Sequence, residues 1–230
     1  MQATLVGATF GKALAEKRFD VLVNNIANIS TAGFKTVRVR FVIGTASTVP
    51  SIESATTSID FSPGALVRTE NPLDLAIEGD GFFVVSEKGS LRYTRNGQFK
   101  IDGEGRIVTA NGSPVLGRGG EIRVRGASIE VEPDGSIFVD GVMVDRLRIA
   151  DFAKKDALRY AGLSLFSAGD EREIEAKDYT IRQGYYEGSN VSMILELTNL
   201  INVLRVFETY TKISQMQEEL NSKLTDSMRT

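Results

Sequence analysis

Carboxylates beside glycines are the residues whose type and spacing could do chemistry in this chain. Glu78 lies two residues before Asp80, and Asp102 lies two residues before Glu104. Paired carboxylates serve in glycoside hydrolysis and bind metal ions. The chain has no D-x-D-x-D-G calcium loop, however, and both pairs lie in hairpin-like sequence. Turn formation therefore explains these acidic residues better than catalysis does.

Two glycine-containing segments are candidate anion sites. Residues 7–13, GATFGKA, resemble a phosphate-binding loop, but the glycines are one residue too close and no Ser or Thr follows the lysine. Small residues that let two helices approach explain this segment better. Residues 117–120, GRGG, could cradle an anion, and an ordinary loop between strands explains them equally well.

Composition excludes most enzyme classes. The 230 residues include no Cys, His or Trp. Cysteine nucleophiles, Ser-His-Asp triads, conventional zinc sites and disulfides are therefore excluded. With 27 basic and 30 acidic residues, the net charge of −3 argues against a nucleic-acid partner. No cleavable signal and no apolar stretch long enough to insert into a membrane is recognisable. We expect no enzyme activity, no cofactor and no metal.

The N-terminal region has a helical pattern. Apolar residues recur every three or four positions over residues 2–28, which predicts an amphipathic helix weakened by Gly7 and Gly11. Gly33, which can adopt a positive φ angle, follows the end of this helix. Residues 37–41 alternate apolar and basic side chains, as in a strand. The Ser- and Thr-rich residues 45–62 suggest an extended, weakly structured connection.

The middle of the chain has the period of β-strands. Apolar residues alternate over residues 71–166, with a short apolar run at residues 82–85. Six turn dipeptides interrupt this pattern, at residues 88–89, 96–97, 102–103, 111–112, 134–135 and 140–141. Asn-Gly and Asp-Gly suit hairpins, because both central residues of a type I′ turn have positive φ. We predict an all-β, hairpin-rich module with a sandwich or barrel-like architecture.

A second helical pattern follows a predicted strand at residues 179–183. Ser189 or Asn190 is a plausible N-cap. Residues 189–230 contain no Gly or Pro, and apolar side chains recur in steps of four and three, as in a coiled-coil seam. This seam comprises Met193, Leu197, Leu200, Leu204 and Phe207. The two terminal helices would bury their apolar faces against each other or against neighbouring copies, and the breadth of the stripes favours self-association.

The predicted fold is therefore α+β, with a central β module between amphipathic helices that pair as a coiled coil. We divide the chain into an N-terminal helical assembly segment at residues 1–30 and an extended connector at residues 31–70. The β module then covers residues 71–178, and a return strand and long helix cover residues 179–230.

Four segments, in order along the chain, resemble the bacterial flagellar rod and hook protein family. Residues 24–35 read NNIANISTAGFK and resemble the N-terminal signature of that family. Residues 71–85, NPLDLAIEGDGFFVV, and residues 93–99, YTRNGQF, resemble its central signature. Residues 183–191, QGYYEGSNV, are similar to its C-terminal motif. The resemblance spans essentially the whole chain.

The resemblance implies a structural role. Members build the flagellar drive shaft, which crosses the periplasm, from subunits exported by the type III apparatus without a cleavable signal. Their terminal helices line the inner tube, their β module lies outside, and their partners are other rod subunits and the export apparatus. Residues 114–117, 145–152 and 162–166 look more like the proximal-rod type than the distal-rod type. We predict a proximal rod subunit, with a distal rod subunit as the alternative.

The predicted assembly interface lies at both ends of the chain. Asparagine side chains near the end of the first helix either cap it or form hydrogen bonds between subunits, and Gly33 with Phe34 fixes the exit from that helix. The interface comprises Asn24, Asn25, Ile26, Asn28, Gly33, Phe34, Asn190, Met193, Leu197, Leu200, Leu204 and Phe207.

A rival hypothesis is a binding protein or adhesin, with the β module as the binding part and the helices as tails. It requires a concave aromatic surface. The aromatic residues at positions 82, 83, 93 and 99 are explained more simply as core.

Overall fold

The computed structural model describes residues 2–44 and 51–227. The chain divides into two compact units. The helical unit contains the described residues of 1–27, 37–58 and 192–230, and the β unit contains residues 28–36 and 59–191. Two terminal helices thus flank a β-rich central region, which confirms the predicted α+β class. Within the described part, neither long helix is apolar enough to cross a membrane.

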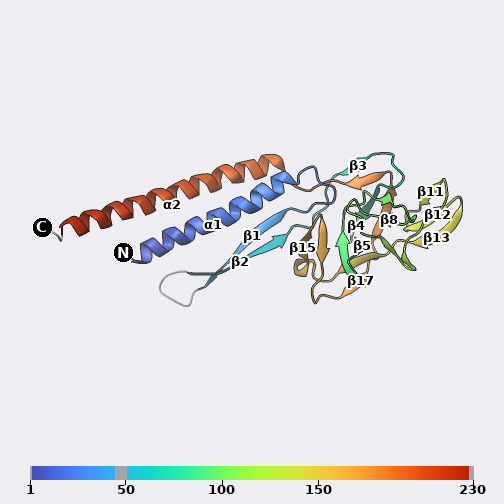
Figure 1. Cartoon of the computed structure of the whole chain (residues 1–230), viewed down its shortest axis with the longest axis horizontal. Helices are drawn as coiled ribbons and strands as arrows, with labels where there is room; N and C mark the ends of the chain where they lie inside the picture. Colours follow the sequence, from blue (N-terminus) through green and yellow to red (C-terminus); the bar gives the residue numbers. More distant parts are fainter. Residues whose placement is uncertain (1, 45–50, 228–230) are drawn as a thin grey trace. The chain divides into compact units, whose positions relative to one another are not determined.

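The helical unit consists of two long helices and a strand pair. Its elements are α1 (Gln2–Ala27), β1 (Val37–Gly44), β2 (Ser51–Ile59) and α2 (Met193–Ser227). Figure 1 shows α1 and α2 side by side, with β1 and β2 running beside α1. The prediction of weak structure over residues 45–62 was wrong at β2, which pairs with β1. β-Branched residues such as Thr56, Thr57 and Ile59 favour a strand there. Residues 45–50 lie outside the described residues.

The long C-terminal helix begins later than the sequence pattern predicts. Its first backbone hydrogen bond runs from the Glu196 N–H to the Ser192 carbonyl, 2.9 Å away. Neither Ser189 nor Asn190 is therefore its N-cap. The Asn190 side chain instead forms hydrogen bonds with other segments of the β unit, and these compete with helix capping for the same amide group.

The β unit is built from antiparallel pairs around one six-stranded sheet. The order in that sheet is β15-β16-β6-β5-β14-β17. Its strands are β5 (Phe82–Glu87), β6 (Ser90–Thr94), β14 (Ile149–Phe152), β15 (Arg159–Gly162), β16 (Leu165–Ser167) and β17 (Glu173–Glu175), with the short helix η1 (Lys155–Ala157) before β15. The predicted strand at residues 179–183 is β18 and pairs with β4.

Smaller sheets complete the β unit. They are the pairs β3–β19, β4–β18, β7–β8 and β9–β10 and the three-stranded sheet β11-β12-β13. Their strands are β3 (Leu66–Arg68), β4 (Leu75–Gly79), β7 (Lys100–Ile101), β8 (Ile107–Val108), β9 (Leu116–Gly117), β10 (Gly120–Glu121), β11 (Ile129–Val131), β12 (Ser136–Val139), β13 (Val142–Arg146), β18 (Tyr179–Gln183) and β19 (Tyr185–Glu187).

Strand β5 is apolar on both of its faces. Phe82 and Val84 belong to one buried cluster, whereas Phe83 and Val85 belong to another. Successive side chains of a strand point to opposite faces, so the core of the β unit extends over both sides of the central sheet. A strand buried on both faces reads as an unbroken apolar run, which explains why residues 82–85 lack the alternation of their neighbours.

The turn dipeptides act in two different ways. Lys88 and Gly89 have φ angles of 49° and 80°, as do Asp140 and Gly141, so the predicted type I′ geometry is confirmed at these two hairpins. At residues 111–112 and 134–135 only the glycine has a positive φ. The prediction was wrong at Gly97, and it was also wrong at Gly103, because neither glycine has a positive φ. At Gly103 the Asp102 side chain makes the turn by accepting a hydrogen bond from the Glu104 N–H at 2.9 Å. In a turn that is closed by a side chain in this way, the glycine does not need a positive φ.

Replacing Gly89 by alanine tests the role of backbone conformation in the hairpin. A Cβ atom at Gly89 would meet no atom within 4 Å, so only the φ of +80° opposes the change. We expect Gly89→Ala to lower the free energy of unfolding by about 1–2 kcal/mol. Urea unfolding followed by tyrosine fluorescence measures this difference, because the chain has no tryptophan.

Gly103→Ala is the matched control for this prediction. Gly103 has equally open surroundings but no positive φ. We expect this variant to be unchanged or stabilised by up to about 1 kcal/mol. Equal destabilisation by both substitutions would contradict the assignment of the cost to φ.

Candidate assembly interface

The two helices of the helical unit approach closely at small residues. A Cβ atom on Gly11 would lie 2.3 Å from the ring of Tyr210, so only glycine permits this contact. Ala15, one turn later, is 3% exposed, and Val203 on α2 is 8% exposed. The glycine-containing segment at residues 7–13 is therefore part of a helix, and Gly11 serves helix packing there.

Asn25 links three elements of the helical unit. Its amide group donates to the Val37 carbonyl at 2.8 Å and accepts from the Val37 N–H at 3.0 Å, which ties α1 to β1. The same side chain donates to Glu196 on α2 at 3.4 Å. Asn25 is 1% exposed and Glu196 is 3% exposed. Asn25 thus provides a buried hydrogen-bonding link within the unit, whereas its neighbour Asn24 is exposed.

The predicted apolar seam of α2 is only partly buried. Met193, Leu197 and Leu204 are 48%, 43% and 43% exposed, whereas Leu200 and Phe207 are half-buried. Glu196 and Tyr210 of α2 meet α1, and the buried Val203 lies midway between them, so these three residues recur every seven positions. Part of the seam is thus left uncovered within the described residues.

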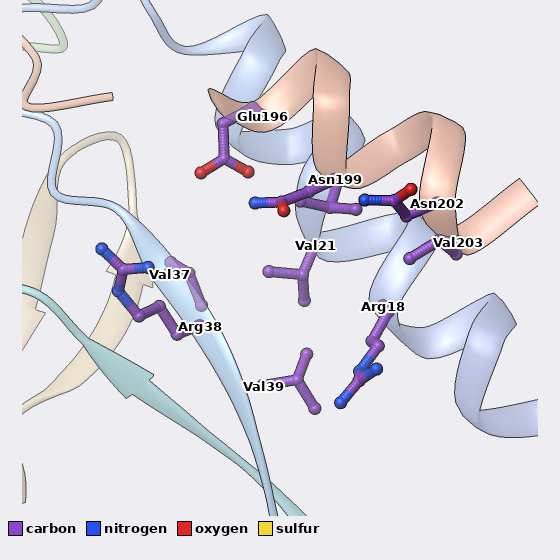
Figure 2. Close-up of a pocket in the computed structure, with 10 residues that line it drawn as sticks. Arg18, Val21, Val37, Arg38, Val39, Glu196, Asn199, Asn202 and Val203 are labelled. Atoms are coloured by element: carbon purple, nitrogen blue, oxygen red, sulfur yellow. The ribbon is translucent and has the colours of Figure 1, made fainter. Parts of the chain in front are cut away.

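A mixed polar and apolar cleft lies between α1, α2 and β1. Figure 2 shows Val37 and Val39 on β1 near side chains of the two helices, which include Arg18 on α1 and Asn199 on α2, whereas Arg38 extends away from the helices. The cleft has a volume of about 320 Å³. It holds no paired carboxylates, and the described part of the chain contains no group of three or more metal-binding side chains.

The link after α1 enters the β unit at Gly33 and Phe34. Gly33 has a φ of +64°, and a Cβ atom there would lie 2.1 Å from the Asn96 nitrogen. Its N–H donates to the Glu187 carbonyl at 2.7 Å. Phe34 is fully buried and packs edge-to-face on Tyr160, with ring centroids 6.0 Å apart. The predicted role of these two residues in fixing the exit from the helix remains a prediction.

A buried ion pair lies directly beyond Phe34. Lys35 Nζ lies 2.6 Å from Glu187 Oε1, and the two side chains are 0% and 1% exposed. Lys35 also donates to the Ser62 carbonyl at 2.7 Å, and the Gly64 N–H donates to Glu187 Oε1 at 2.8 Å. Arg95 lies 3.5 Å from the other carboxylate oxygen. We call these five residues the Glu187 cluster.

Burial governs the electrostatics of the Glu187 cluster. It lowers the pKa of Lys35 and the pKa of Arg95, because a charged group loses its hydration in the interior. The Glu187 carboxylate opposes both shifts by attracting the cations. Arg95 also donates to the Ile77 carbonyl at 2.9 Å. Glu187 is thus the main counter-ion of both cations of the cluster.

The Asn190 side chain forms hydrogen bonds with two of the segments that the Glu187 cluster also joins. Its side-chain oxygen accepts from the N–H and the hydroxyl of Thr36, both at 2.8 Å. Its side-chain nitrogen donates to the carbonyls of Asp60 and Ser62, both at 2.9 Å. The chain passes between its two units four times, after residues 27, 36, 58 and 191. Glu187 and Asn190 bind the β-unit segments next to these crossings.

Sequence reasoning brought some of these residues to attention and missed others. Asn25, Gly33, Phe34 and Asn190 were predicted for the interface, and the structure places each in a defined contact. Ile26 and Asn28 are half-buried, and Asn28 accepts a hydrogen bond from the Thr31 hydroxyl. The missed residues are Lys35, Arg95, Glu187 and Glu196. The first three lie inside the segments that carry the family resemblance, which was the available signal.

Comparison with known proteins identifies the class. The flagellar hook protein FlgE/F/G D1 domain matches residues 76–139, and the flagellar basal body rod FlgEFG protein C-terminal model matches residues 182–227. A flagellar basal-body rod protein of Rhizobium meliloti (strain 1021) is 35% identical over 228 residues, covering 95% of this chain and 94% of the relative. The chain therefore belongs to the flagellar basal-body rod protein family, as its four segments predicted.

The relatives also indicate a type within the family. The R. meliloti protein is named FlgF, and FlgF of Caulobacter vibrioides is 32% identical over 89% of both chains. FlgG of Bacillus subtilis (strain 168) is 29% identical over the full length of both. The chain is thus more similar to these FlgF proteins than to this FlgG protein.

Asn25→Ala tests the link between α1, β1 and α2. The substitution removes both hydrogen bonds to the Val37 backbone and the contact with the buried Glu196 carboxylate. We expect the free energy of unfolding of the helical unit to fall by about 1–3 kcal/mol. Lys17→Ala, at an exposed position of the same helix, is expected to change it by less than about 0.5 kcal/mol. Circular dichroism at 222 nm during denaturation measures both, and equal effects would count against the link.

Glu187→Gln tests the ion pair of the β unit. The variant keeps the shape of the side chain but removes the main counter-ion of the buried Lys35 and Arg95, so we expect a loss of about 3–5 kcal/mol. The exposed pair of Arg118 and Glu175 supplies the control, because Glu175→Gln should cost less than about 1 kcal/mol. Urea unfolding measures both variants. A small loss for Glu187→Gln would mean that the cluster contributes little to stability.

Proposed function

We propose that this protein is a structural subunit of the flagellar rod, positioned in its proximal part and assembled axially through the terminal helices. Family membership and the similarity to FlgF proteins support this role. The observation that carries it is the exposed apolar surface along α2. Ile194, Leu197 and Ile201 are 82%, 43% and 53% exposed. Apolar residues repeated along one helix require a partner in the assembled state.

The finer architecture follows from the same reasoning. The terminal helices pair as a coiled coil in the rod, and the seven-residue recurrence of Glu196, Val203 and Tyr210 supports this pairing. The central module is sandwich-like, a proposal supported by the apolar clusters on both sides of its six-stranded sheet. Residues 1–30 and 179–230 then serve assembly, residues 31–70 connect, and residues 71–178 form the module.

The biological setting forms part of the proposal. The subunit passes through the flagellar export apparatus and joins other rod subunits across the periplasm. Its role is mechanical, with no catalytic step and no inserted membrane segment. The β unit has its own buried core, which supports a structural module that folds separately from the assembling helices.

A distal position in the rod is the second candidate. Similarity to FlgG of B. subtilis favours it to a lesser degree. Electron cryotomography of cells lacking the gene distinguishes the two positions. A rod missing or truncated near the inner membrane supports the proximal position, and a longer rod that stops before the outer membrane supports the distal one.

The adhesin hypothesis gains no support from the aromatic residues. Phe82, Phe83, Tyr93 and Phe99 are between 0% and 4% exposed, so they form no open surface for a sugar.

Leu197→Asp tests assembly through α2. Leu197 is exposed in the subunit, so the substitution should leave both units folded while placing a charge in the proposed interface. We expect motility in soft agar, and the amount of subunit in purified basal bodies, to fall by about tenfold or more.

Asn202→Asp provides the matched control, because it adds the same charge at an exposed position that lines the other cleft and lies off the Ile194–Ile201 face. This variant should keep most of its motility. Circular dichroism of both purified chains checks that folding is unchanged. Normal motility of the Leu197→Asp strain would overturn assembly through this surface.

A further inference from the structure

An apolar groove with an acidic rim lies between the two helices of the helical unit. Ala15 and Phe19 of α1 and Leu204 and Phe207 of α2 line it, and its volume is about 220 Å³. Phe19 is 37% exposed and Leu204 is 43% exposed, so the groove is open to solvent. Glu16 and Asp20 lie along its α1 side. Within the described part of the chain, neither carboxylate forms an ion pair.

A complementary stripe runs along α2. Ile194, Leu197 and Ile201 are exposed apolar residues, and Arg205 follows Ile201 by one helical turn. Their spacing of three and four residues places all four on one helix face. The residues that meet α1, such as Glu196 and Val203, lie on the opposite face. This stripe therefore points away from α1, and Arg205 is without an ion-pair partner among the described residues.

The pairing of α1 with α2 sets a register for the charges. Asn25 meets Glu196 and Gly11 meets Tyr210, and each helix has the same number of residues between its two contacts. The helices are thus antiparallel and keep step along their length. If residues are counted along both helices from these contacts, Arg205 of α2 lies at the same height along the helix pair as Glu16 of α1.

A neighbour whose helices run in the same axial direction, turned about that axis to bring its stripe to the groove, would preserve these levels. If such a copy lay beside the groove without axial shift, its Arg205 would come opposite Glu16, one turn from Asp20. Its Ile201 would reach the level of Asp20 and Phe19, at the apolar part of the groove. Glu208 of the copy would come beside Lys12, which lies over the Phe207 ring at 5.2 Å. Both the apolar surfaces and the alternating charges match in this one register.

We propose that the groove between α1 and α2 receives the Ile194–Ile201 stripe of a second copy of this chain, with Arg205 of that copy paired to Glu16 and Asp20. The inference rests on the proposed rod function and specifies the lateral contact within it. The contact is heterologous, because groove and stripe are different surfaces of one subunit. Repetition of such a contact gives an open helical array when the rotation does not close a ring.

Engineered cysteines test the contact directly, because the natural chain has none. Cells lacking the natural copy would produce two full-length chains, one with Phe19→Cys and one with Ile201→Cys. We expect oxidation of purified basal bodies to give a disulfide-linked dimer of the two chains. Asn202→Cys, exposed beside Ile201 but lining the other cleft (Figure 2), should give at least about tenfold less dimer. This design excludes cross-links within one chain.

The outcomes separate this inference from the proposed function. Immunoblots of the same basal bodies show whether each variant is incorporated. Incorporation without a 19–201 cross-link overturns the groove contact and leaves the rod function intact. Absence even of the unaltered chain from basal bodies overturns the rod function itself.

A charge reversal gives an independent test. Glu16→Arg should reduce incorporation by about fivefold or more, and so should Arg205→Glu. The double variant should recover at least half of the natural level, because the pair is restored with opposite polarity. If the incorporated fraction of the double variant were as low as the product of the fractions of the two single variants, the neighbour at this groove would not be a second copy. Circular dichroism confirms that each chain remains folded.

Discussion

One buried carboxylate, Glu187, constrains much of what surrounds it. One of its oxygens accepts hydrogen bonds from Lys35 and from the Gly64 N–H, and the other faces Arg95. An ion taken out of water is costly unless each of its partners is in place. The segments that carry Lys35, Gly64 and Glu187 must therefore come together for any one of them to be stable. These segments lie beside the points where the chain passes between its two units.

The two units obtain their stability in different ways. The β unit has apolar clusters on both sides of its central sheet and needs no other surface to complete them. Among the side chains of the helical unit whose burial the structure describes, few are buried, and these include Asn25, Glu196 and Val203. A polar link such as Asn25 specifies one arrangement, because its hydrogen bonds form in one geometry only. Much apolar surface on α2 remains exposed.

Periodicity alone predicted the outline of the fold. Helical spacing located α1, and alternation located β18 at the observed residues. It could not place the start of α2, because Asn190 has the chemistry of an N-cap but is held by Thr36 and Asp60, which are distant in sequence. The Lys35–Glu187 pair was not predicted, because its two residues are also distant in sequence. Long-range polar contacts leave no periodic signal, whereas a buried helix face does.

The difference in length between the two helices leaves part of α2 uncovered in the subunit. α2 has 35 residues and α1 has 26, so α1 pairs with only part of the length of α2. The seven-residue recurrence that meets α1 uses one face of α2, and Ile194 and Ile201 lie on the other. Exposed apolar area is unfavourable in the free subunit and becomes favourable when a second surface covers it. Under the proposed function, covering these residues with a neighbour is the driving force for assembly.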